Sequence, residues 1–117
     1  MKGKRLSGDI GEEYAVGLLK EHNYKILERN FRTKVGEIDI IAEDRDTLVF
    51  VEVKTRWSKK YGKPEEAVNK RKLYRIKRAG DYYLLTHKNV FNKQRIDVVA
   101  IEVNNKKVSS AKIIKVV

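Results

Sequence analysis

Two stretches in the first half of the chain alternate between apolar and polar residues, which is the pattern of a strand with one buried face. They cover residues 36–42 and 48–54, and both are rich in the β-branched residues that strands favour. The polar residues between them, centred on Arg45 and Asp46, predict a tight turn. Together these segments predict a β-hairpin whose register is fixed by the turn.

That register brings acidic residues together on one face of the hairpin. Asp39 is predicted to lie opposite Glu52, and residues two apart on a strand point the same way. Glu37 and Lys54 therefore form the next pair on the same face, and the other face carries the residues expected in the core: Ile38, Ile40, Val51 and Val53. Two carboxylates directly opposite each other repel at a Cβ separation of about 4.5–5.5 Å. A divalent cation between them removes that cost; a solvated, salt-bridged hairpin face is the simpler alternative.

The oxygen atoms of this predicted pair suit a hard cation. Carboxylates from Asp39 and Glu52, with the backbone carbonyl of Val53, are the kinds of ligand that Mg²⁺ or Mn²⁺ prefers. Lys54 would add a positive charge beside the ion. A bound metal, a polarised water and a lysine are the components needed to hydrolyse a phosphodiester. The hairpin therefore predicts a metal-dependent hydrolytic site.

The remaining pattern predicts an α/β fold with the order α-β-β-β-α-β-β, a central mixed sheet flanked by helices. Helical spacing of apolar residues and strand alternation define five further elements: helices over 8–22 and 64–85, and strands over 24–31, 95–103 and 108–117. The last of these is predicted to be an edge strand. Residues 1–6 are predicted to form a mobile basic arm.

Composition favours a single cytoplasmic domain, residues 1–117, whose 41% hydrophobic content is enough to pack a core. No apolar run approaches the ~18 residues that a membrane span needs. The N-terminal residues lack the apolar segment of a secretion signal. The chain has no cysteine, which excludes disulfides and thiolate metal sites. We therefore expect a cytoplasmic protein without a membrane partner.

The positive charge of the chain is concentrated in one block. The formal net charge is +11, and residues 54–95 hold fourteen Lys and Arg but only three acids. A positive field beside an acidic site attracts nucleic acid. Lys72 falls on the predicted buried stripe of the second helix, so it needs an acidic group or a phosphate as partner. The residues predicted to bind nucleic acid are Arg56, Trp57, Arg71, Lys72, Arg75 and Arg78. The alternatives are a solvated arginine row, and a tryptophan that packs on the domain edge.

Several short motifs resemble a known family. They are Gly11-Glu12, Asn30-Phe31-Arg32, Gly36-Glu37-Ile38-Asp39, Val49-Phe50-Val51-Glu52-Val53-Lys54-Thr55-Arg56 and Arg95-Ile96-Asp97-Val98-Val99. This set is similar to the YraN-like family of small uncharacterised bacterial proteins. Asp39 with Glu52-Val53-Lys54 resembles the signature of the PD-(D/E)XK, restriction-endonuclease-like nuclease superfamily, similar in fold to Holliday junction resolvases. Ile38 stands where the superfamily's name has a proline.

The resemblance implies a restriction-endonuclease-like core and a Mg²⁺- or Mn²⁺-dependent endonuclease acting on DNA, with branched or structured DNA as the candidate substrate. It implies catalytic roles for Asp39, Glu52, Lys54 and Glu12, the last being a further carboxylate supplied by the first helix. A solvated Glu12 that only stabilises the helix is the alternative. The alternative function is a non-catalytic module of the same fold that binds DNA or RNA. Symmetric cutting of two strands needs two sites, which predicts a homodimer formed through the last strand or the first helix.

Overall fold

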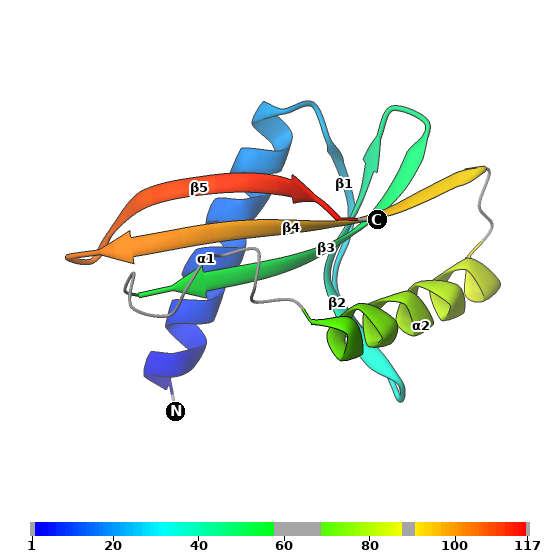
Figure 1. Cartoon of the computed structure of the whole chain (residues 1–117), viewed down its shortest axis with the longest axis horizontal. Helices are drawn as coiled ribbons and strands as arrows, with labels where there is room; N and C mark the ends of the chain where they lie inside the picture. The colour runs from blue at the N-terminus through cyan, green and yellow to red at the C-terminus, as the bar shows by residue number, and fades with distance from the viewer. Residues whose placement is uncertain (1, 58–68, 88–90, 117) are drawn as a thin grey trace.

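The computed structural model describes the backbone of residues 2–57, 69–87 and 91–116, and the side chains of these ranges from Ile10 onward. Two helices and five strands follow one another in the predicted order α-β-β-β-α-β-β (Figure 1). The helices are α1 (Lys2–Glu21) and α2 (Lys70–Thr86), and the strands are β1 (Lys25–Thr33), β2 (Gly36–Asp44), β3 (Thr47–Arg56), β4 (Lys93–Asn104) and β5 (Lys107–Lys115). The α/β fold expected from the sequence is confirmed.

The strands form one mixed sheet in the order β1-β2-β3-β4-β5. Neighbouring strands pair antiparallel except for β3 and β4, which are parallel and are joined through α2. A parallel pair requires such a crossover connection, whereas antiparallel neighbours can be joined by tight turns. The predicted edge position of the last strand is confirmed, since β5 pairs with β4 at one end of the sheet.

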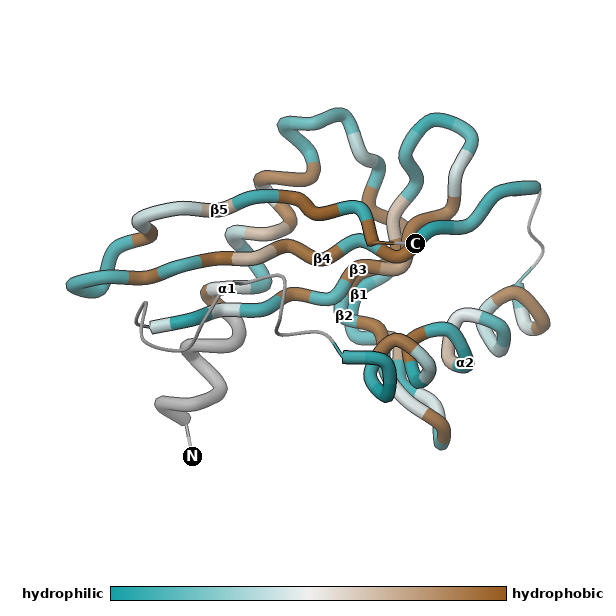
Figure 2. The backbone as a smooth tube through the Cα atoms, viewed as in Figure 1, coloured by the Kyte–Doolittle hydropathy of each residue, from teal (hydrophilic) through white to brown (hydrophobic). Residues whose placement is uncertain are grey.

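Both faces of the sheet are covered, each by one helix. Ala15, Val16 and Leu19 of α1 pack with residues such as Ile40 and Val51 on one face. On the other face α2 supplies a second cluster: Ile76, Ala79 and Tyr83 pack with Phe31, Ile38, Ile41, Leu48, Phe50 and Ile96. Figure 2 shows hydrophobic residues along the middle of β4 and alternating hydrophobic and hydrophilic stretches along α2. A sheet with two buried faces explains why the central strands are almost continuously apolar.

The hairpin register is confirmed over five pairs. Ile40 pairs with Val51, and the ladder continues without a shift to Asp44 opposite Thr47. Arg45 adopts a left-handed φ of 58° in the turn between the strands. The acidic residues whose position depends on this register lie immediately beyond the end of the ladder.

The hairpin face assigned to Ile38 from simple alternation is wrong. Ile38 packs in the α2-side cluster, although Ile40, two residues later, packs on the α1 side. This part of β2 no longer pairs with β3 and continues with β1 alone, where Ile38 is in register with Phe31. Simple alternation therefore does not hold across this part of β2. Ile38 packs beside its partner Phe31 in the cluster on the α2 side.

Two helix boundaries also differ from the prediction. The arm expected over residues 1–6 is helical from Lys2, because lysine, arginine and leucine are good helix formers and no proline interrupts them. The second helix begins at Lys70 and not near residue 64. Asn69 is extended and its side chain accepts a hydrogen bond from the N–H of Lys72, which makes it the N-cap. Residues 64–68 of the predicted helix lie outside the described residues.

None of the helices in the described part of the chain is long and apolar enough to cross a membrane.

Candidate functional site

An open cleft of about 1080 Å³ lies where β2 and β3 separate. Beyond Ile40 and Val51, β2 continues with β1 and β3 continues with β4, so the two strands diverge. The residues that line the cleft come from the β1–β2 turn, the diverging strands and the start of α2: Arg32, Thr33, Lys34, Val35, Gly36, Glu37, Asp39, Glu52, Val53, Asn69, Arg71, Lys72, Arg75 and Ile76. Gly36 contributes to this shape, since a Cβ there would lie 2.8 Å from the carbonyl oxygen of Arg75.

Where β2 and β3 diverge, the side chain of Asp39 bonds to the backbone of β3. The N–H of Val53 donates to Asp39 Oδ2 at 2.8 Å. One carboxylate oxygen thus ties β2 to β3, and the other remains as a candidate ligand. The sequence predicts Asp39 directly opposite Glu52; the ladder ends one pair earlier, at Ile40 and Val51, and this bond joins Asp39 to the residue that follows Glu52.

Glu52 is the buried acid of the cleft, with only 6% of the residue exposed. Its Oε2 lies 2.5 Å from Nζ of Lys72, which reaches it from α2. The expectation that Lys72 needs an acidic partner is confirmed, because a buried carboxylate and a half-buried lysine satisfy each other here. The contact also joins β3 and α2, two of the elements that line the cleft.

The two carboxylates of the cleft oppose each other's ionisation. Burial, followed by the negative charge of Glu52, raises the pKa of Asp39 from its ordinary value of 3.8 to about 7. The hydrogen bond from Val53 lowers this pKa, whereas the charges of Glu12 and Glu37 raise it further. The repulsion between Asp39 and Glu52 that the sequence predicts is therefore present, even with Lys72 beside Glu52.

Glu12 lies near this acidic pair but is held by basic and polar residues of β1. Its Oε1 accepts hydrogen bonds of 3.1 Å from Nη2 of Arg29 and from Nδ2 of Asn30. α1 comes close to the end of β3 at the preceding residue, because a Cβ on Gly11 would lie 2.3 Å from Oγ1 of Thr55. Glu12 thus points toward the sheet and is not a fully solvated acid, and only 14% of its side chain is exposed.

The other predicted residues divide between the cleft and the surrounding surface. Arg71 and Arg75 line the cleft with Lys72, whereas Arg78 lies further along α2. Lys54 is partly buried on β3 and does not line the cleft. Trp57 is 51% exposed and Arg56 is partly buried, both where β3 ends.

Glu37 is not paired with Lys54, because the β2–β3 ladder stops before them. Its carboxylate lies 3.3 Å from Arg32 across the β1–β2 pair. The divergence of the strands that opens the cleft is thus also the reason that this second predicted pair does not form.

The donor set fits a hard divalent cation that keeps most of its water. Within the described ranges, no three Asp, Glu or His side chains lie close enough to hold one ion. Two carboxylates, Asp39 and Glu52, and the carbonyl of Val53 remain as candidate ligands. Mg²⁺ is commonly held by one or two carboxylates with waters and substrate phosphates, so this small set is adequate.

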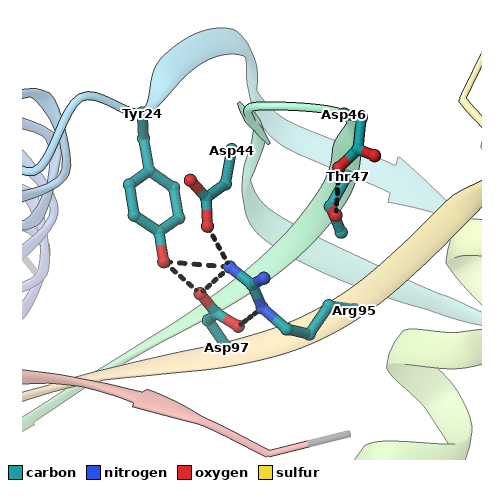
Figure 3. Close-up of polar contacts among 6 residues, drawn as sticks. All are labelled: Tyr24, Asp44, Asp46, Thr47, Arg95 and Asp97. Carbon is teal, nitrogen blue, oxygen red and sulfur yellow. Dashed lines mark hydrogen bonds and ion pairs between the residues drawn. The ribbon is translucent and has the colours of Figure 1, made fainter.

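A second polar network lies on the α1 face of the sheet (Figure 3). Asp97 is fully buried and accepts from Nε of Arg95 at 2.7 Å and from the hydroxyl of Tyr24 at 2.7 Å. Nη2 of Arg95 also donates to Asp44 at 2.8 Å. Burial, followed by the bond to Asp97, raises the pKa of the Tyr24 hydroxyl, so it remains a donor. These partners satisfy one another, which gives the network a structural role.

Sequence reasoning did not identify several of the residues that shape the cleft. Arg29 and Asn30, which hold Glu12, and Asn69, which caps α2, depend on contacts between distant segments. The motif containing Asn30 was an available signal, whereas nothing in the local sequence pairs Arg29 with α1.

Residues 11–101 of the chain match the Uncharacterised protein family UPF0102. The chain belongs to this family. A UPF0102 protein of Acetivibrio thermocellus is 50% identical over 104 residues, which cover 88% of this chain and 80% of that protein. A UPF0102 protein of Caldicellulosiruptor saccharolyticus is 48% identical over 103 residues, 88% of this chain and 87% of that protein. One from Moorella thermoacetica is 42% identical over 113 residues, 96% of this chain and 94% of that protein.

UPF0102 membership confirms the resemblance to the YraN-like family. The matched segment begins at Gly11 and ends at Ile101, so it contains Glu12 and the three acids that line the cleft, Glu37, Asp39 and Glu52, and excludes β5. The family's description names no activity.

Proposed function

We propose that this protein is a divalent-metal-dependent endonuclease that hydrolyses phosphodiester bonds in DNA, with branched or structured DNA as the favoured substrate. The observation that carries the proposal is the pair Asp39 and Glu52. Two mutually repelling, partly or fully buried carboxylates lie in an open cleft with cationic residues on its walls. Such a pair costs stability in a protein that binds nothing there.

A polyanion is the substrate class that the walls of the cleft favour. Arg71, Lys72 and Arg75 come from α2, and Arg32 and Lys34 come from the turn between β1 and β2. A cleft with cationic walls concentrates negatively charged ligands. Phosphate groups can therefore enter beside carboxylates that would repel them without the metal.

Asp39, Glu52 and the carbonyl of Val53 would hold Mg²⁺ or Mn²⁺. The bound ion would supply a polarised water and would stabilise negative charge on the phosphoryl group. The hydrogen bond from Val53 fixes the Asp39 carboxylate at the divergence of the strands, so that its orientation is set before substrate binds.

Lys72 is the cation best placed to act on the substrate, and we assign it the charge-stabilising role that the sequence motif gives to Lys54. Its Nζ already lies at the buried acid of the cleft, whereas Lys54 does not line the cleft. Once a cation neutralises Glu52, the ammonium group of Lys72 becomes available to donate to a phosphate oxygen. Lys54 remains a candidate for orienting the attacking water.

The experiment is a cleavage assay on a panel of labelled DNAs of matched sequence: a four-way junction, a flap, a nicked duplex and a linear duplex. Each is incubated with Mg²⁺, Mn²⁺ or a chelator. We expect cut products with metal only, and a loss of about 10²–10³-fold or more in the Asp39→Asn and Glu52→Gln variants. An Asp46→Asn variant is the matched control, since Asp46 is an exposed acid outside the cleft.

A second candidate function is a binding module of the same fold that cuts neither DNA nor RNA. The ion pair between Lys72 and Glu52 favours it, because it satisfies Glu52 without a metal. Metal-independent binding with no cleavage of any substrate in the panel would support this candidate and would overturn the endonuclease proposal.

A further inference from the structure

The outer face of α2 carries an exposed row of arginine and aromatic side chains. One side of the helix faces the sheet through Ile76, Ala79, Gly80 and Tyr83, and the other side faces away from the sheet (Figure 1). On that outer side Tyr74 is 60% exposed and Tyr82 is 50% exposed. With about 100° between successive helical residues, they share one broad face with exposed arginines: Arg71, Arg75 and Arg78.

The charge of α2 indicates what this face can bind. The helix contains six Lys or Arg and a single acid, Asp81. Exposed tyrosines flanked by arginines occur at protein interfaces as well as at nucleic-acid sites. The strong positive excess favours a polyanion over an average protein surface.

Contacts with neighbouring side chains hold the rings of Tyr74 and Tyr82 in defined positions. The guanidinium of Arg78 donates to the hydroxyl of Tyr74 at 2.9 Å and its Cζ lies 5.7 Å from the ring centroid. Tyr82 rests against Phe31, with ring centroids 6.3 Å apart and planes tilted by 36°. These contacts restrict both rings without burying them, which lowers the entropic cost of stacking a ligand on them.

The row is continuous with the cleft. Arg71 and Arg75 line the cleft, and Tyr74, Arg78 and Tyr82 continue from them along the helix. Tyr74 and Tyr82 are eight residues apart, which is about 12 Å along a helix axis. That separation allows two bases to stack at separate places on one strand while arginines between them contact phosphates.

We propose that the outer face of α2 binds a single-stranded segment of nucleic acid, with bases stacked on Tyr74 and Tyr82 and phosphates held by Arg71, Arg75 and Arg78. A duplex keeps its base faces stacked inside, so it offers the tyrosines nothing to stack on, whereas an unpaired strand does. This inference rests on the proposed endonuclease function. The bound strand would be the unpaired arm of a DNA substrate whose scissile phosphate enters the cleft.

The test is fluorescence anisotropy with a labelled single-stranded oligonucleotide and with the corresponding duplex, in a chelator so that nothing is cut. The variants are Tyr74→Ala with Tyr82→Ala, the same pair changed to Phe, and Tyr14→Ala on α1 as an exposed tyrosine elsewhere. Removing one aromatic side chain on which a base stacks lowers the affinity for a single strand roughly tenfold or more. We therefore expect the double alanine variant to bind the single strand about 100-fold more weakly and the duplex almost unchanged.

The phenylalanine pair should retain most of the single-strand affinity, because it keeps both rings, and Tyr14→Ala should bind as the wild type does. Equal losses for single strand and duplex, or no loss for either, would overturn the inference, and the second result would favour a protein partner on this face. The readout is separate from cleavage. Tyrosine-dependent single-strand binding without any cutting would contradict the endonuclease proposal alone, whereas cutting with no contribution from the tyrosines would contradict this inference alone.

Discussion

At the scale of a single residue, the surroundings of Asp39 shift the pKa of its carboxyl group in opposite directions. Burial and the charge of Glu52 oppose its ionisation, and one hydrogen bond from Val53 favours it. Because the first two are larger, the folded protein holds the proton of Asp39 up to about pH 7. The unfolded chain loses the same proton near the ordinary value of 3.8.

This difference predicts how stability depends on pH in the absence of metal. Between about pH 4 and 7 the folded state binds the extra proton, so the free energy of unfolding falls as pH rises through this window. Asp39→Asn cannot ionise and keeps an oxygen for Val53. In chelator we expect it to be more stable than the wild type by about 1–3 kcal/mol at pH 8 and nearly equal at pH 4, measured by denaturant unfolding. A stability difference independent of pH would contradict the raised pKa.

Asp97 is the opposite case, a buried acid whose partners neutralise it. Asp97→Ala would leave the guanidinium of Arg95 partly buried with one acid fewer. Removing one partner of a buried ion pair costs about 3–5 kcal/mol, and denaturant unfolding should show a loss of this size. Asp46→Ala, which removes an exposed pair with Lys93, should change stability little. If Asp97→Ala lowered the free energy of unfolding as little as Asp46→Ala does, the network would not stabilise the fold.

At the scale of the elements, Gly80 of α2 and Gly17 of α1 differ in how closely their surroundings approach. A Cβ on Gly80 would lie 2.5 Å from Cε2 of Phe50, so α2 packs against this ring with no room for a methyl group. Gly17 of α1 has nothing within 4 Å of the same position. The same substitution should therefore have opposite effects in the two helices.

We expect Gly80→Ala to destabilise the protein by about 1–3 kcal/mol, because overpacking a core costs this much. Gly17→Ala should stabilise it by about 0.5–1 kcal/mol, since alanine is the better helix former and meets no clash. Thermal and denaturant unfolding of both variants measure this. A stabilising Gly80→Ala would show that α2 does not pack against Phe50 as described.

Element type and hairpin register followed from the sequence because they depend on local patterns. Alternation and the Arg45 turn were sufficient to align Ile40 with Val51. The helix boundaries were less accurate, because the capping role of Asn69 competes with a plausible start at Pro64. The face of Ile38 could not be predicted, since it depends on where β2 leaves β3, and side-chain pattern alone does not record that point.

At the scale of the whole molecule, the acids Glu12, Asp39 and Glu52 come from three different elements, α1, β2 and β3. Asp39 and Glu52 could be paired from the hairpin, and Lys72 could be assigned an acidic partner because lysine is rarely placed toward a core without one. The contacts of Glu12 with Arg29 and Asn30 could not be anticipated, because they require the packing of α1 against β1.

The homodimer remains a prediction at this scale. β5 lies at the edge of the sheet, with Ile113 and Ile114 half-buried and Val116 38% exposed. An apolar edge strand is a candidate for pairing with a second copy. Light scattering at micromolar concentration should give about twice the 13.7 kDa mass of the chain, and Val116→Lys should lower the dimer fraction. A single species of 13.7 kDa for the unmodified chain would rule the dimer out.

The claim that Asp39 and Glu52 form a metal site is tested most directly by calorimetric titration of Mn²⁺ into the protein without nucleic acid. We expect one ion per chain for the wild type and for Asp46→Asn, and at least a tenfold weaker affinity for Asp39→Asn and for Glu52→Gln. The loss follows because each variant replaces a charged ligand with a neutral amide. Mn²⁺ binding of equal affinity in the wild type and in both cleft variants would contradict the metal site.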